Sequence, residues 1–459
     1  MLLPMTPADA VFLYAETRDQ PMHVGGLQLF EPAPGMERAD ILDMFQTLLS
    51  SNEVSPLFGK RPRRSLLTGL QWAWEPDDRF DVEHHVRHNA LPRPGRILEL
   101  LALCSRLHSS LLDRHRPLWE LHLIEGLADG RFAVYNKIHH SLTDGISAMR
   151  LMQSSLSPDP QFRGGEPPWR AGLETGVGTE PPALLEPTEI ARAALQGAQE
   201  LAGLPLVLGR SVNRALRARG GSLAFNAPKT MFNVPITGAR RVAAQSWPLE
   251  RIQRVARVGR CSLNDVVLAM SAGTLRRYLQ GLDALPASPL VAMVPVSLRP
   301  NDGSAGGNAV GAVMCNLATD IADPAARLAA VTASMRQGKR ALARMSRLQI
   351  LALTALAMSP LAIDPLLGSA GMHRPPFNLI ISNVPGPRQP LYWNGARMAG
   401  LYPLSIPVHG QALNISCVSH ADQLSFGLTG CRSAVPHLQR MLGYLEDELA
   451  ALEVAVAAN

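Results

Sequence analysis

The chain has 459 residues, of which 46% are hydrophobic and 18% are charged, and its formal net charge is +6. This composition is typical of a globular protein and excludes a disordered one, while the length exceeds one ordinary core and predicts two lobes. The five cysteines are scattered and odd in number, which argues against a disulfide framework and fits a reducing cytoplasm.

Neither a targeting segment nor a membrane span is expected. Residues 1–4 (MLLP) lack the charged start and the long apolar region of a secretory signal. The most apolar stretch, residues 348–367, is interrupted by Pro360, Asp364 and Pro365, whereas a spanning helix needs about twenty apolar residues in succession. We therefore predict no transmembrane helix, and we expect this stretch to line a core or a tunnel.

The N-terminal lobe, residues 1–156, is predicted to alternate helices and strands. Apolar residues recur with a helical period in some segments and form alternating or continuous runs in others. The predicted helices cover residues 39–49, 97–112 and 146–156, and the predicted strands cover residues 24–30, 121–125 and 131–138.

Composition changes after residue 156. Residues 157–187 are rich in proline, glycine and acids, which is a linker signal, and we assign residues 157–229 to an interlobe linker and helix with a basic segment. Residues 210–260 carry eleven lysines and arginines against the single acid Glu250. Such a stretch can attract anionic lipid head groups, hold phosphates, or form a solvated face between lobes. Nucleic acid is disfavoured, because no nucleic-acid-binding motif is present.

The C-terminal lobe, residues 230–459, is predicted to mix the same kinds of element. A helix starts near residue 262, with Ser262 or Asn264 as its N-cap. Leucines at three-and-four spacing predict a final helix over residues 438–452. The predicted strands cover residues 289–296, 310–317, 378–382, 412–418 and 424–430.

Residues 139–145 (HHSLTDG) carry the most chemical information. His139 and His140 follow a predicted strand and precede an Asp-Gly turn signal, so a strand delivers an imidazole to a turn. Histidine exchanges a proton near neutral pH, which makes such a residue a candidate general base. The pair alone decides nothing, because residues 84–85 form a second pair without an Asp-Gly, and paired histidines also occur in cores. A metal site is the weaker interpretation, since the chain has no His-Glu-x-x-His and no Cys-x-x-Cys.

Six short segments taken together carry a resemblance to a known family. They lie at residues 6–25, 117–120 (PLWE), 139–145 (HHSLTDG), 264–269 (NDVVLA), 295–299 (PVSLR) and 382–387 (SNVPGP). The histidine motif is shared by chloramphenicol acetyltransferase, plant alcohol acyltransferases and peptide-synthetase condensation domains. All six segments, in this order, resemble the bacterial wax ester synthase/acyl-CoA:diacylglycerol acyltransferases.

The resemblance implies both a fold and a reaction. The fold is α/β (α+β), with two chloramphenicol-acetyltransferase-like lobes, each a mixed sheet with flanking helices, and an active-site channel between them. The reaction moves a long-chain acyl group from acyl-CoA to a fatty alcohol and/or diacylglycerol, giving wax ester and/or triacylglycerol. His140 takes the proton of the acceptor hydroxyl and returns it to the thiolate. No covalent acyl-enzyme is expected, and the chain has no Gly-x-Ser-x-Gly elbow. Acyl-CoA is a substrate, and no cofactor or metal is expected.

Other residues of the motif receive supporting roles. His139 is expected to support His140. Asp144 could orient His140 as in a triad, but the resemblance implies instead a structural salt bridge between Asp144 and Arg299. Gly145 is expected to supply a turn conformation that a side chain would obstruct.

The oxyanion that forms in an acyl transfer needs a hydrogen-bond donor. Asn264 matches a family residue that faces the reaction centre, and a helix N-cap is an equally weighted alternative. Ser382 and Asn383 are further candidates, for which ordinary turn chemistry is the favoured interpretation. Residues 117–120 are taken as structural.

Two other functions stay open. The same fold can acylate a different acceptor, such as a small alcohol, an amine or a carrier-bound substrate. Alternatively, a catalytically silent protein can coat lipid droplets through the basic segment. We expect a cytoplasmic protein, peripheral on the inner face of the membrane or on lipid inclusions, with no nucleic-acid partner.

Overall fold

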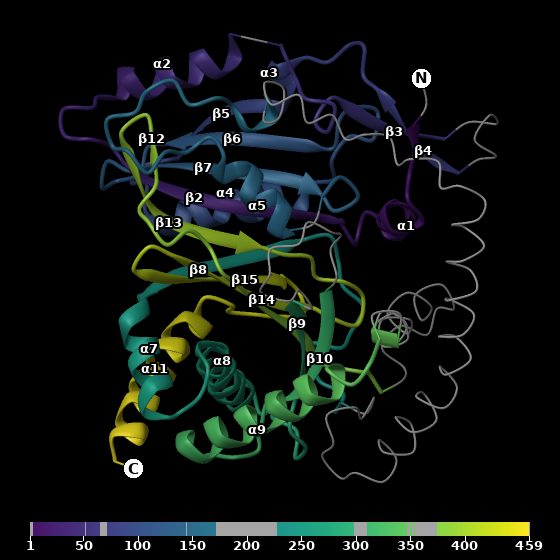
Figure 1. Ribbon diagram of the computed structural model, residues 1–459, viewed down its shortest axis with the longest axis vertical. Coiled ribbons are helices and arrows are strands. Elements are labelled where there is room, and N and C mark those ends of the chain that lie inside the picture. Colours follow the sequence, from purple (N-terminus) through teal and green to yellow (C-terminus); the bar gives the residue numbers. More distant parts are fainter. Residues whose placement is uncertain are drawn as a thin grey trace.

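Two lobes of mixed sheet and helix lie one above the other in Figure 1. The computed structural model describes residues 3–50, 52–64, 71–143, 145–170, 227–297, 310–346, 349–350, 353 and 374–458. Within these residues, none of the helices is both long enough and apolar enough to cross a bilayer.

A six-stranded sheet forms the centre of the N-terminal lobe. Its order is β12-β13-β2-β7-β6-β5, and neighbouring strands are antiparallel except for the parallel pair β5 and β6. Strand β7 lies inside the sheet, and every one of its residues is buried. The strands are β2 (His23–Glu31), β5 (Val86–Ala90), β6 (Trp119–Glu125), β7 (Phe132–His139), β12 (Tyr392–Trp393) and β13 (Ala396–Leu404).

Helices cover both faces of β7, which explains its nearly continuous burial. Val134 packs in one cluster with the apolar residues of α2 (Arg38–Leu49) and α5 (Gly145–Gln153). Its neighbour Tyr135 packs in another cluster with α4 (Ile97–Ser109), because successive side chains of a strand point to opposite faces. Residues of β7 with odd numbers therefore lie on the α4 side of the sheet.

A short helix and a small sheet precede and flank this lobe. Helix α1 (Pro7–Ala15) begins with Pro7, and the Thr6 side chain caps it by accepting the Asp9 N–H at 3.1 Å. The small sheet has the order β1-β4-β3. Its strands are β1 (Leu3–Pro4), β3 (Lys60–Arg64) and β4 (Trp72–Pro76), and helix α3 (Val82–His85) leads into β5.

A second six-stranded sheet, of order β10-β9-β11-β14-β15-β8, forms the C-terminal lobe. Four helices pack against it and share one apolar core with its strands. Helix α8 is central to this core. The helices are α7 (Leu249–Val258), α8 (Leu263–Gln280), α9 (Pro324–Leu342) and α11 (Arg440–Ala457). The strands are β8 (Arg240–Pro248), β9 (Val291–Ser297), β10 (Val310–Asn316), β11 (Leu379–Val384), β14 (Leu413–His420) and β15 (Gln423–Cys431).

Strand β13 joins the two lobes. It comes late in the chain but pairs antiparallel with β2, from Arg397 opposite Glu31 to Leu404 opposite Gly25. It also contacts β14 and β15 of the C-terminal sheet, and α4 packs against β8. The predicted division at residues 156 and 230 therefore places residues 392–404 in the wrong lobe, because the return of the chain to the first sheet leaves no mark in local composition.

Most of the elements predicted from periodicity are present with small shifts of their ends. The predicted strand at residues 131–138 corresponds to β7, and the predicted helix at residues 438–452 overlaps α11. The sequence patterns did not predict α1, α3, α7, α9, β1, β3, β4, β5, β8, β12 and β13. Most of residues 157–229 and of the apolar stretch at 348–367 lie outside the described residues.

Candidate active site

The site begins where β7 ends beside β2. His139 lies opposite His23 in this antiparallel pair. The His139 N–H donates to the Leu118 carbonyl at 2.9 Å, and the His140 N–H donates to the Met22 carbonyl at 2.9 Å. The end of β7 is thus held from both sides, and the chain turns immediately after it.

The two histidines occupy different environments. The His139 side chain is fully buried, on the same side of the sheet as Tyr135 and Lys137. His140 leaves the sheet and is half-buried. Its ring stacks on Phe12 of α1, with centroids 4.2 Å apart and an interplanar angle of 19°. Of the two rings, only that of His140 is partly exposed.

The hydrogen bonds of His139 assign its tautomer. The Ser141 N–H donates to Nδ1 at 3.1 Å, and the Ser141 hydroxyl lies 2.7 Å from the same atom. A backbone N–H can only donate, so Nδ1 is an acceptor and the ring proton is on Nε2. Nε2 lies 3.3 Å from Oε2 of Glu16. The two atoms are not aligned for a linear hydrogen bond, so the attraction is that of a carboxylate for a polarised N–H.

Glu16 is a buried carboxylate at the end of α1. Its side chain is 2% exposed, and Oε1 accepts two hydrogen bonds from Arg114, at 2.9 and 3.1 Å. Oε2 accepts the Met22 N–H at 3.2 Å. Burial opposes ionisation of Glu16, but His139, the Met22 N–H and Arg114 outweigh it and hold the pKa below its ordinary value. An ionised carboxylate therefore lies directly under the histidine pair.

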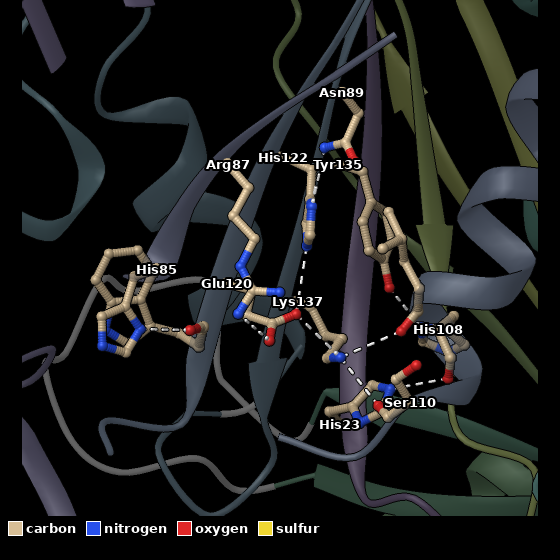
Figure 2. Close-up of polar contacts among 12 residues, drawn as sticks. His23, His85, Arg87, Asn89, His108, Ser110, Glu120, His122, Tyr135 and Lys137 are labelled. Carbon is tan, nitrogen blue, oxygen red and sulfur yellow. Dashed lines mark hydrogen bonds and ion pairs between the residues drawn. The ribbon is translucent and has the colours of Figure 1, made fainter. Parts of the chain in front are cut away.

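A second ionic network lies further along the same side of the sheet (Figure 2). The ammonium group of Lys137 donates to the carbonyls of Leu107 and Ser110, at 3.1 and 2.9 Å, and lies 3.2 Å from Oε2 of Glu120. Burial lowers the pKa of Lys137, and Glu120 opposes that effect. Burial opposes ionisation of Glu120, yet His122, Lys137 and Arg87 lower its pKa to about 2. Each of the three ammonium protons has an acceptor, so the pair is charged and structural.

Neutral histidines extend this network towards the C-terminal half of the chain. His108 Nε2 donates to the Ser405 carbonyl at 3.0 Å, so its Nδ1 accepts the Tyr135 hydroxyl at 2.9 Å. His23 Nε2 donates to the His108 carbonyl at 3.0 Å. Burial lowers the pKa of His108 to about 3. These rings are uncharged at neutral pH, and they fix α4 and the segment after β13 against the strand end.

The sequence profile of the wax ester synthase/diacylglycerol acyltransferase catalytic domain matches residues 5–267, and that of the family's C-terminal domain matches residues 306–453. This chain belongs to the wax ester synthase/diacylglycerol acyltransferase family. It is an acyl-CoA-dependent O-acyltransferase. The resemblance inferred from the six segments is confirmed.

Relatives and solved structures agree with this assignment. Two Mycobacterium tuberculosis relatives that carry diacylglycerol O-acyltransferase names are 51% identical over 458 residues and 49% identical over 453 residues. Each alignment covers 98% of this chain, and it covers 100% and 99% of the relatives. The wax ester synthase/diacylglycerol acyltransferase of Marinobacter aquaeolei VT8 has a TM-score of 0.78 at 41% identity, covering 99% of this chain and all of that one.

The predicted fold class is also confirmed. A condensation domain of the CDA synthetase superposes with a TM-score of 0.57 at 17% identity, covering all of this chain and 96% of that chain. At this identity the match concerns the fold alone. The acyltransferase thus has the two-lobed architecture that it shares with condensation domains.

Of the three predicted site residues Asp144, Gly145 and Arg299, the first and the last lie outside the described residues. Gly145 is described, and the prediction of a special turn conformation is wrong for it. It has no positive φ, it is the first residue of α5, and an added Cβ would meet no described atom within 4 Å. Where a turn that requires glycine was expected, the chain begins helix α5, and this position does not require glycine.

The remaining candidates lie in the other lobe. Asn264 is in the first turn of α8, whose N-cap is Ser262, in a reciprocal capping box with Asp265. The N-cap alternative for Asn264 is therefore wrong. Ser382 and Asn383 are half-buried inside β11 rather than in the turn after it. The structure places His139 and His140 together at one strand end of this acyltransferase, whereas Asn264 lies on α8 and Ser382 and Asn383 lie on β11 of the C-terminal lobe.

Glu16, Phe12 and Arg114 are site residues that the sequence analysis did not assign. Glu16 and Phe12 fall inside the first of the six matching segments, but their contacts with residues 139–141 join positions far apart in the chain. The one signal in the sequence that could have pointed to Glu16 was its position as a carboxylate inside a segment that matches the family. Among the described residues, no group of three or more histidine, cysteine or acidic side chains is arranged to hold a metal ion.

Proposed function

We propose that this enzyme transfers a long-chain acyl group from acyl-CoA to the hydroxyl of a fatty alcohol and/or diacylglycerol, with His140 as general base. The observation that supports this role is the contrast within the histidine pair. The His139 ring is buried and turned towards Glu16, whereas the His140 ring stands at the turn against Phe12, where a hydroxyl can approach it. A base must lie within hydrogen-bond reach of the proton it removes.

The reaction needs one base that acts twice. His140 removes the hydroxyl proton as the alcohol oxygen attacks the thioester carbonyl and forms the new C–O bond. The C–S bond then breaks, and the thiolate of coenzyme A takes the proton from His140. Ester and free thiol leave, and the imidazole is neutral again. No acyl-enzyme and no cofactor beyond the acyl-CoA substrate take part.

Two finer features belong to the same proposal. A salt bridge between Asp144 and Arg299 would hold the turn after His140 in shape, as the family resemblance implies. Contact with an anionic membrane or a lipid inclusion would bring both insoluble substrates to the enzyme, and the family's substrates and the net charge of +6 support it. Salt-sensitive sedimentation with anionic vesicles tests this contact.

The test is release of free thiol from palmitoyl-CoA by purified protein, with and without an added acceptor. The proposal predicts release that depends on a long-chain alcohol or diacylglycerol, with ester as the product. Release only with a small alcohol, an amine or a carrier-bound substrate would show that the acceptor is different. No release with any acceptor would leave a lipid-binding protein and overturn the proposal.

A further inference from the structure

One carboxylate oxygen contacts two groups that are each one hydrogen bond away from the backbone of residues 140 and 141. Oε2 of Glu16 accepts the Met22 N–H, and the Met22 carbonyl in turn accepts the His140 N–H. The same oxygen faces Nε2 of His139, whose Nδ1 accepts the Ser141 N–H. The positions of His140 and of Ser141 therefore both depend on this one oxygen, through Met22 and through His139. Glu16 also ends the helix that carries Phe12, the ring on which His140 stacks.

We propose that Glu16 is the positioning residue of the active-site turn, and that it acts on His140 through His139 and Met22. This inference rests on the proposed role of His140 as base. Glu16 touches neither substrate nor the reacting atoms. Its carboxylate holds the Nε2–H tautomer of His139, and that tautomer leaves Nδ1 free to accept the Ser141 N–H and close the turn around His140.

The role requires a carboxylate rather than any polar group. Around Glu16, all the described partners are donors: two N–H groups of Arg114 at Oε1, and the Met22 N–H with the His139 Nε2–H at Oε2. A carboxylate offers acceptors on both sides. A glutamine offers one oxygen and one NH₂ group, so its NH₂ must face either Arg114 or the pair at Oε2. Either orientation sets donors against donors in a buried place, where unmatched polar groups are costly.

The experiment is Glu16→Gln, assayed for kcat and for the KM of acyl-CoA on protein shown to be folded by its circular dichroism and melting curve. We expect kcat to fall about 10- to 100-fold, the cost of a displaced catalytic group, with KM for acyl-CoA changed by less than about twofold. A kcat within about twofold of wild type would overturn the proposal.

Glu448→Gln is the matched control. Glu448 is also a buried carboxylate, with its side chain 3% exposed, and it pairs with Arg327 and Arg277 between helices of the C-terminal lobe. This variant loses a comparable ion pair far along the chain from β7. We expect it to lower the melting temperature and to leave kcat per folded molecule unchanged. A fall in kcat equal to that of Glu16→Gln would show a general effect of lost stability and would overturn the positioning role.

A double-mutant cycle tests the route through His139. If Glu16 acts on His140 partly through His139, the combined Glu16→Gln, His139→Leu variant is less impaired than the product of the two single effects. His139→Gln, which keeps a donor and an acceptor, should recover part of the activity that His139→Leu loses. Independent, multiplicative effects would contradict this route.

His140→Ala distinguishes a failure of the general-base role of His140 from a failure of the positioning role of Glu16. If it retains wild-type turnover, the proposed function of His140 fails, and the positioning role fails with it. If it is inactive while Glu16→Gln turns over normally, the general base stands and only the positioning role of Glu16 fails.

Discussion

The two histidine pairs of this chain look alike in the sequence and differ in what lies beneath them. In each pair one ring is buried and the other half-buried. His85 stacks on Trp119 with centroids 4.6 Å apart, and its Nδ1 donates to the Trp119 carbonyl at 2.8 Å. His139 instead faces the carboxylate of Glu16. The first pair is set on an aromatic core, whereas the second is set on an ionised carboxylate at a strand end, which is the setting that our proposal assigns to proton chemistry.

The largest expected effect separates the two half-buried rings. His140→Ala should lower kcat about 10²- to 10⁴-fold, the usual contribution of a general base, because the proposed mechanism assigns the hydroxyl proton to this ring. His84→Ala is the matched control and should leave kcat unchanged. Burial, Arg116 and Arg87 lower the pKa of His84 and outweigh Glu120 and Asp113, which raise it, so the neutral form of this ring is favoured. Alcohol-dependent thiol release measures both. Equal losses in the two variants would erase the distinction between the pairs.

The buried ring of the pair at residues 84–85, which is His85, should matter for stability and not for turnover. His85→Phe keeps the stack on Trp119 but leaves the Trp119 carbonyl without its donor, so we expect a loss of about 1 to 3 kcal/mol in the free energy of unfolding. Its kcat per folded molecule should stay at the wild-type value. Urea unfolding and the same thiol assay measure the two quantities. A large fall in kcat with unchanged stability would place this pair in the active site after all.

The pH dependence of the free energy of unfolding tests the structural role of the buried histidines, because the folded state keeps these rings neutral. Burial lowers the pKa of His85 to about 4 and that of His108 to about 3, from an ordinary 6.5. Between pH 6.5 and 4 the unfolded chain therefore binds more protons than the folded one. The stability that depends on these neutral rings is complete above pH 6.5 and is lost as the pH falls, by up to about 1.4 kcal/mol per pH unit for each ring.

Urea unfolding at pH 7.5, 6.5 and 5.5 measures this slope. Wild-type stability should change little between the first two values and should fall between the last two. His85→Phe, which removes one of these groups, should give a shallower fall by about 1.4 kcal/mol per pH unit. A slope that is the same in both proteins would mean that His85 already titrates normally in the folded state.

The strand that carries the candidate base could be predicted from the sequence, whereas the residues that surround that base could not. Strand β7 and the turn after it were predictable, because an apolar run followed by Asp-Gly is a local signal. The role of Glu16 was not predictable, because its contact with His139 spans more than a hundred residues and depends on how α1 docks on the sheet. For the same reason β13 was assigned to the wrong lobe, since pairing with β2 is decided by the tertiary fold. Local pattern predicted the candidate base, and only the structure revealed the residues that contact it and its neighbours.

The smallest expected effect tests the corrected role of Gly145. This residue was expected to supply a turn conformation that a side chain would obstruct, but it begins α5 without a positive φ, and no described atom lies within 4 Å of an added Cβ. A glycine in such a position costs chain entropy on folding. Gly145→Ala should therefore leave the free energy of unfolding unchanged or raise it by about 0.4 to 1 kcal/mol. Urea unfolding measures the change. A loss of more than about 1 kcal/mol would restore the original expectation of a conformation that only glycine adopts, and it would mean that the turn after His140 is fixed by its own backbone as well as by Glu16.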